Sequence, residues 1–153
     1  MTYKKYLKAL AICKNLYNEE CEHVKKLKLF NKKRWSEGKV TFEEYTKENE
    51  RLEDILKKAT DRYDRYVERL KMHFAMQDAP AKVGDILWSG NRIIRVEQIK
   101  LSAFDFPMLK FFGVQLTTKG LPYVNQKKYP DGGIYQKNVT SVNGVPYTYK
   151  VRE

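Results

Sequence analysis

Two rows of apolar and aromatic residues, each advancing by alternating steps of three and four, constrain the fold of this chain most strongly. The first row runs from Tyr3 to Arg34 and the second from Phe42 to His73, and neither is interrupted by Pro or Gly. Such stepping is typical of the seam of a supercoiled helix. The candidate seam residues are Tyr6, Leu10, Cys13, Tyr17, Val24, Leu27, Phe42, Tyr45, Leu52, Leu56, Ala59, Tyr63, Tyr66 and Leu70.

The segment between the two rows predicts a tight turn followed by a sharp helix start. Gly38 suits a left-handed cap at the end of the first helix, and Thr41 and Glu44 have the spacing of a capping box. Two helices of about 32 residues that are joined by so short a link must fold back antiparallel. We therefore predict helices over residues 3–36 and 42–76 that are folded back at Gly38.

Pairing the two rows about Gly38 places Asn31 opposite Tyr45 and leaves Glu20 in the middle of the seam. A buried carboxylate without a partner is costly. We therefore expect Glu20 either to lean out toward Lys57 or to occupy a locally wet part of the seam. A catalytic or metal-binding role would need placed partners, and the acidic and histidine neighbours of Glu20 match no recognised ligand spacing.

A two-helix hairpin buries only one narrow stripe, but these helices also carry apolar residues outside the seam. Helices with a second apolar edge usually bury it. The covering surface would be the C-terminal half of the chain, a second copy of the chain or a different protein. The apolar residues outside the seam are Leu7, Ile12, Leu16, Phe30, Trp35, Ile55, Val67 and Phe74.

The hydrophobic period changes near Pro80 from helical to strand-like. The β-like segments lie at residues 83–88, 92–101, 109–117, 133–139 and 146–151. One slip in the alternation within 92–101 predicts a β-bulge. The pair Asn143-Gly144 predicts a tight hairpin before the last strand.

Five short strands in about 70 residues predict a small antiparallel β-barrel. An opening strand over 83–88, a long bent second strand and a one-turn link near 138–142 resemble an SH3-like or Tudor-like barrel, with an OB-like barrel as the competitor. The resemblance covers residues 82–152 and includes no motif that would carry binding residues across. We therefore predict an α+β chain with a helical hairpin over 1–77 and a barrel over 78–153.

The formal net charge is +11, from 30 Lys and Arg against 19 Asp and Glu. Residues 1–76 carry 19 basic and 13 acidic groups, and residues 77–153 carry 11 and 6, so the second half is more one-sidedly basic. A charge of this size favours an anionic partner such as nucleic acid or an acidic protein. The alternative interpretation is that the lysines serve solubility.

A loop over 119–133 combines lysines, tyrosines and amides, a mixture that stacks bases and pairs phosphates. Lysines at the start of the first helix oppose its backbone dipole, which hints at an external anion there too. The candidate anion or nucleic-acid contacts are Lys119, Tyr123, Asn125, Lys127, Lys128, Tyr129, Lys4 and Lys5. The alternative is a solvated loop whose tyrosines cover the end of the barrel.

The sequence contains no signal for secretion and no membrane span. Cys13 and Cys21 are separated by roughly 12 Å along one predicted helix, too far for a disulfide, so we expect free thiols. We expect a cytoplasmic, intracellular protein, or a virion component if the chain is viral. There is no paired-cysteine metal motif, phosphate-binding glycine loop or nucleophile elbow. We therefore expect no enzyme activity, cofactor, bound metal, membrane contact or small-molecule substrate.

Three functions are compatible with these features. We expect a non-catalytic structural or interaction protein within a larger assembly, such as a viral or nucleoprotein assembly. The hairpin would be its docking arm and the barrel a second contact surface, with another protein or a second copy as partner. The first alternative is a nucleic-acid-binding protein that contacts phosphates through residues 119–133. The second is an inhibitor or regulator of one target protein.

Overall fold

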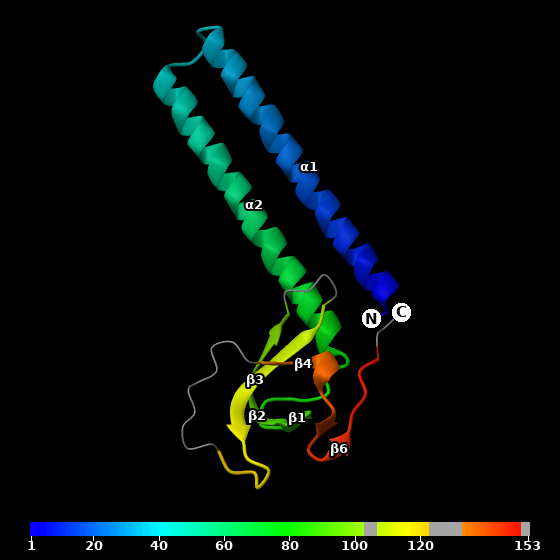
Figure 1. Cartoon of the computed structure of the whole chain (residues 1–153). Coiled ribbons are helices and arrows are strands. Elements are labelled where there is room, and N and C mark those ends of the chain that lie inside the picture. The colour runs from blue at the N-terminus through cyan, green and yellow to red at the C-terminus, as the bar shows by residue number, and fades with distance from the viewer. Residues whose placement is uncertain (103–106, 123–132, 151–153) are drawn as a thin grey trace. The chain divides into compact units, whose positions relative to one another are not determined.

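The computed structural model describes residues 1–102, 107–122 and 133–150. The chain divides into two compact units. One unit is Tyr3–Leu70, and the other is Lys71–Glu153 together with Met1–Thr2. The first is helical, and the second combines the end of the second helix with an antiparallel sheet (Figure 1).

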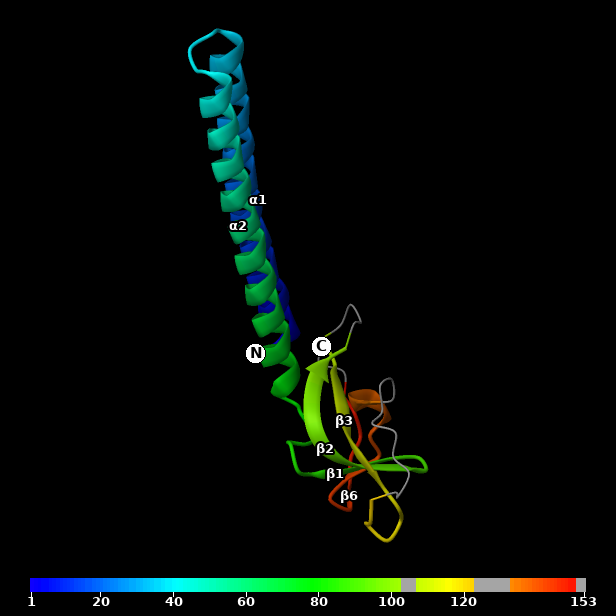
Figure 2. The same cartoon turned by 90° about the vertical axis from the view of Figure 1, so that its left-hand side faces the viewer.

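Both predicted helices are confirmed, as α1 (Tyr3–Ser36) and α2 (Phe42–Met76). They run side by side in opposite directions in both views (Figures 1 and 2). The turn between them is closed by Gly38, whose φ of 67° only glycine adopts at little cost. The amide of Lys39 donates to the Arg34 carbonyl at 2.9 Å, and the Gly38 amide donates to the Trp35 carbonyl at 3.0 Å. These two bonds form the Schellman cap that satisfies the last carbonyls of α1.

The predicted capping box at the start of α2 is also confirmed. The Glu44 amide donates to the Thr41 hydroxyl oxygen at 3.2 Å, and the Thr41 amide donates to the Glu44 carboxylate at 2.8 Å. The amide of Thr41 stabilises the charged form of the carboxylate and lowers the pKa of Glu44 below its ordinary value. The start of α2 is therefore set by local sequence, independently of any tertiary contact.

In its described residues, the second unit is built on one antiparallel sheet of six strands in the order β4-β3-β2-β1-β5-β6. The strands are β1 (Ile86–Ser89), β2 (Arg92–Leu101), β3 (Leu109–Leu116), β4 (Ile134–Tyr135), β5 (Ser141–Val142) and β6 (Val145–Pro146). The predicted α+β class is confirmed. The predicted five-stranded barrel is not shown, because the described residues form six strands in an open order with β4 and β6 at its edges.

The C-terminal strands differ most from the prediction. The expected strand over 133–139 is only two residues long, because the chain turns into a 3-10 helix, η1 (Gln136–Asn138). Of the expected strand over 146–151, only Pro146 is in a strand, as the end of β6 in the β5–β6 hairpin; residues 147–150 form no strand, and residue 151 lies outside the described residues. Asn143 and Gly144 both adopt positive φ, at 50° and 83°, so the turn takes two residues and the strands flank it directly.

The predicted β-bulge in β2 is confirmed. The register between β2 and β3 shifts between Val96 and Gln98, and Gly113 lies opposite Val96 on β3. A Cβ atom on Gly113 would lie 1.8 Å from the Arg95 carbonyl oxygen, which no side chain can accommodate. The bulge lets the two long strands bend together (Figure 2).

The core of this unit joins the last turns of α2 to one face of the sheet. Ala75 of α2 is buried with side chains from β1, β2, β3 and β4, and Met72 packs against the same cluster. Its buried members are Ala75, Ala81, Leu87, Ile94, Val96, Leu109, Phe111, Ile134 and Val139. The sheet is therefore covered on this face by residues of its own unit.

Candidate docking groove on the helical hairpin

The candidate seam residues differ widely in burial. Four are buried, namely Tyr6, Val24, Leu52 and Ala59. Eight are half-buried, namely Leu10, Cys13, Tyr17, Leu27, Tyr45, Leu56, Tyr63 and Leu70. Phe42 and Tyr66 are exposed, at 67% and 53% of their surface. The hairpin by itself therefore covers its own seam incompletely.

The loop-proximal half of the seam is held by a buried polar group. The Asn31 side-chain amide donates to the backbone carbonyl of Tyr45 at 3.1 Å and to the side-chain carbonyl of Asn49 at 3.2 Å. Asn31 is 4% exposed. A buried polar group of this kind specifies the register of two helices, because sliding either helix would leave it without partners.

The other half of the seam is aromatic. The rings of Tyr17 and Tyr63 are stacked, with centroids 4.7 Å apart and planes at 19°. The Tyr17 hydroxyl lies 3.1 Å from the Thr60 hydroxyl, which itself donates to the Leu56 carbonyl at 3.0 Å. Tyr17 is therefore the donor in that pair. The stack and the hydrogen bond together fix both tyrosine rings on one side of the hairpin.

These rings form part of a groove of about 340 Å³ between α1 and α2. Its lining combines apolar and aromatic side chains of both helices with one ion pair. The lining residues are Ile12, Cys13, Leu16, Tyr17, Glu20, Ala59, Arg62, Tyr63 and Tyr66. Ile12 and Leu16 are exposed by 51% and 61%, so this side of the groove presents apolar surface to solvent.

Glu20 closes one end of the groove, and its partner differs from the prediction. Neither the expected Lys57 nor water is needed, because the Arg62 guanidinium donates to the Glu20 carboxylate at 2.6 Å. Arg62 reaches Glu20 from the facing helix, where its long side chain spans the edge of the seam. The spacing of the first row predicted that Glu20 lies on the seam. It did not predict Arg62 as the ion-pair partner, because Arg62 does not belong to the second row.

The apolar residues predicted to lie outside the seam are mostly exposed on α1 and covered on α2. Leu7, Ile12, Leu16, Phe30 and Trp35 are exposed, Ile55 and Val67 are half-buried, and Phe74 is buried. Trp35 stacks on Tyr45, with centroids 5.0 Å apart, and so covers the loop end of the hairpin. The unpartnered apolar surface therefore belongs mainly to α1.

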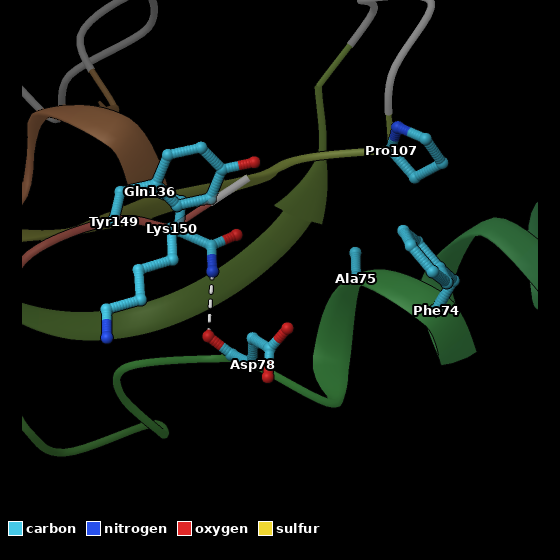
Figure 3. Close-up of a pocket in the computed structure, with 7 residues that line it drawn as sticks. All are labelled: Phe74, Ala75, Asp78, Pro107, Gln136, Tyr149 and Lys150. Atoms are coloured by element: carbon cyan, nitrogen blue, oxygen red, sulfur yellow. Dashed lines mark hydrogen bonds between the residues drawn. The ribbon is translucent and has the colours of Figure 1, made fainter. Parts of the chain in front are cut away.

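A small cavity in the second unit is a weaker candidate (Figure 3). Its volume of about 10 Å³ is near the minimum for one water molecule. Gln136, 2% exposed, donates from its amide to the Asp78 carbonyl at 2.7 Å and accepts from the Leu109 amide at 3.3 Å. Its contacts tie the segment after α2 to β3, so the cavity belongs to the packing of this unit.

The outer face of the sheet carries a cluster of lysines and aromatic rings that the sequence did not single out. The Lys110 ammonium lies 5.2 Å from the Phe112 ring centroid and 4.7 Å from that of Tyr135. The Lys100 ammonium lies 5.5 Å from the same Phe112 centroid. Only the strand register could have revealed this, because it pairs Lys100 with Lys110 and Lys110 with Tyr135.

The predicted anion contacts are only partly within the described residues. Lys4 and Lys5 lie exposed in the first turns of α1, and Lys119 lies exposed in the turn after β3. The other candidates lie outside the described residues, namely Tyr123, Asn125, Lys127, Lys128 and Tyr129. Of the candidate contacts in the 119–133 loop, the structure therefore describes Lys119 alone.

Across residues 1–102, 107–122 and 133–150, no three His, Cys, Asp or Glu side chains converge in a way that could hold a metal ion. In that same part of the chain, no helix has the length and apolar character needed to cross a membrane. Cys13 and Cys21 are both free thiols, each half-buried. Comparisons of the chain with protein-family models, with curated proteins and with solved structures found no match.

Proposed function

We propose that this chain is a non-catalytic interaction protein that uses the helical hairpin as a docking arm within a larger assembly. The observation that carries the proposal is the groove between α1 and α2. It combines exposed aliphatic side chains with a rigid aromatic floor, the Tyr17–Tyr63 stack. Grooves of this composition bind amphipathic partner helices through apolar anchors.

The exposed residues on the two sides of α1 give the proposal a matched test. Leu16 lines the groove, whereas Leu29 does not line it, although it is exposed by 68%. Replacing either leucine by serine removes a similar apolar side chain from a solvent-exposed helix position. Any general effect on helix stability or solubility is therefore shared by both variants.

The experiment isolates the full-length chain with its stoichiometric partner from its cells of origin. We expect Leu16→Ser to lose that partner and Leu29→Ser to retain it, with equal helix content by circular dichroism. Retention of the partner by both variants would show that docking takes place elsewhere on the chain. Loss by both would show a general effect of exposed leucines.

A second candidate function, nucleic-acid binding, is favoured by the Lys100–Phe112–Lys110–Tyr135 cluster on the sheet. Two aromatic rings flanked by two ammonium groups provide the stacking surfaces and the phosphate contacts that single strands use. The net charge of +11 supports the same interpretation.

Fluorescence anisotropy with single-stranded RNA and DNA at two salt concentrations tests this second function. We expect affinity to fall as salt rises and to fall further in Lys110→Glu, because that change reverses the charge beside both rings. Lys137→Glu in η1 provides a control with the same change in net charge. Absence of binding at low salt would exclude nucleic acid as the partner of the sheet.

We also propose that the six-stranded sheet curls into an SH3-like barrel. The support is the bulged long strand β2, the 3-10 helix that precedes β5, and the return of β5 to pair with β1. In addition, Tyr147 after β6 packs against the core, and its hydroxyl lies 3.4 Å from the amide nitrogen of Gln136, just after β4. Nuclear Overhauser contacts between the β4 edge and residues 147–150 would test closure.

A further inference from the structure

We propose that the partner of the groove is an acidic amphipathic helix, an inference that rests on the docking function proposed above. The first observation is a row of arginines along the groove side of α2. Arg62 lines the groove, and Arg65 and Arg69 follow it by three and seven residues. Helical geometry places residues at these spacings along the same side of α2, next to the groove residue Tyr66.

The acidic residues of the same segment lie beyond the arginine row, farther around α2 from the groove residue Tyr66. Asp61 lies four residues before Arg65 and Glu68 lies three residues after it, so both are neighbours of Arg65 on the surface of α2. Asp64 and Glu68 are each two residues from Tyr66, which places both about 160° from it around the helix. Of the described carboxylates, only Glu20 forms an ion pair with this row, through Arg62. The arginines of this segment therefore lie closer to the groove than its acidic residues do.

The facing wall, on α1, is mostly apolar. Ile12 and Leu16 project one helical turn apart along the groove, and Cys13 lies between them in sequence on its lining. A partner helix would place its apolar side chains between these residues and the Tyr17–Tyr63 stack. Acidic residues on the flank of that helix would then reach Arg65 and Arg69.

The same charges disfavour a second copy of this chain as the occupant. A symmetric dimer formed through the groove would bring the arginine row of one copy toward the basic surface of the other. Each copy carries a net charge of +11, so desolvating two such surfaces against each other is unfavourable. An acidic helix removes this penalty and adds ion pairs at the rim.

The test measures the affinity of the full-length chain for three synthetic helical peptides of about 20 residues. All share the same leucine content, with leucines at helical spacing in the first two. The first has Glu on the flanks of the leucine row, the second has Lys there, and the third is a scrambled version of the first. We expect the Glu peptide to bind at least about tenfold more tightly than the Lys peptide or the scrambled peptide.

Charge reversal then locates the binding. The Arg65→Glu/Arg69→Glu double variant keeps the Arg62–Glu20 ion pair and should reverse the preference toward the Lys peptide. The Lys47→Glu/Lys57→Glu double variant makes the same change in net charge away from the groove lining and should keep the original preference. Circular dichroism checks that each variant retains its helices, so that a loss of peptide preference cannot be attributed to unfolding.

Three results would overturn the proposal. They are equal affinity for the Glu and Lys peptides, absence of binding by every peptide, and a stable dimer in analytical ultracentrifugation that Leu16→Ser dissolves. The proposed docking function has a separate test. If the peptides fail while Leu16→Ser still loses the natural partner, the acidic-helix chemistry is wrong and the docking function stands.

Discussion

The side-chain amide of Asn31 donates a 3.2 Å hydrogen bond to the side-chain carbonyl of Asn49 across the two helices. The same amide reaches the Tyr45 carbonyl at 3.1 Å. Polar groups at this depth cost free energy unless they are paired, so the pairing ties the helices to one register. The aromatic half of the hairpin contributes packing, whereas the Asn31 contacts decide how the helices align.

We predict that Asn31→Ala destabilises the hairpin by about 1–3 kcal/mol, because Asn49 then loses its buried partner. The double variant Asn31→Leu/Asn49→Leu should recover that stability or exceed it, but it should populate more than one helix alignment. Urea unfolding of Asn31→Leu, Asn49→Leu and the double variant measures the coupling energy of the pair. A coupling energy near zero would contradict a shared role for this pair.

Tyr63→Ala removes the ring that stacks on Tyr17, together with its buried area. We predict a loss of about 1–3 kcal/mol, measured by thermal unfolding followed at 222 nm. Tyr66→Ala, one turn along and exposed by 53%, should cost less than about 1 kcal/mol. Equal losses for the two tyrosines would indicate that the stack does not stabilise the seam.

Gly113→Ala should disrupt the β2–β3 pair, because the added Cβ would lie 1.8 Å from the Arg95 carbonyl oxygen. We predict a loss of more than about 3 kcal/mol in the sheet-containing unit. Gly120→Ala is the matched control, with a φ of 77° but open space around its Cβ position, and should cost about 1–2 kcal/mol. Amide hydrogen exchange would report the loss of stability within β2 and β3. Retained protection of these strands in Gly113→Ala would contradict the close approach of residue 113 to the Arg95 carbonyl oxygen.

Asp85 connects the start of the sheet to its hairpin. Its carboxylate accepts from the Lys82 amide at 2.9 Å and from the Asn143 side-chain amide at 3.0 Å. These hydrogen bonds lower the pKa of Asp85 below its ordinary value, and the bond from the Lys82 amide has the largest effect.

A group with a depressed folded-state pKa stabilises the fold above its unfolded-state pKa and loses that contribution as pH falls through the folded-state value. We predict that stability of the sheet unit decreases below about pH 4, and that Asp85→Asn removes part of this dependence. Urea unfolding of both proteins at pH 7 and pH 3 measures it. Parallel pH profiles for wild type and Asp85→Asn would contradict the assignment.

The helical part of the fold could be predicted because its signals are local. The period of the two rows, Gly38 and the Thr41–Glu44 box determine where each helix begins and ends, without reference to distant residues. The bulge in β2 and the turn at Asn143-Gly144 were predictable for the same reason. Each of these features is decided by a few adjacent residues and their backbone preferences.

The C-terminal strands could not be placed in this way. Residues 136–138 have no turn-forming Gly or Pro, and their 3-10 conformation accompanies the contacts of Gln136 with Asp78 and Leu109, both distant in sequence. Likewise, the partner of Glu20 depended on the reach of Arg62 from outside the seam row. The groove itself depends on which apolar residues remain uncovered, and only the folded hairpin reveals that.

The groove contains a residue that reports directly on its occupancy. Cys13 lines the groove, whereas Cys21, a half-buried thiol on the same helix, does not. Alkylation of each thiol can be followed by peptide mass, first in the isolated chain and then in its native complex. If the groove is the docking surface, binding should slow the alkylation of Cys13 by at least about tenfold and leave Cys21 unchanged. An unchanged rate at Cys13 in the complex would contradict the account.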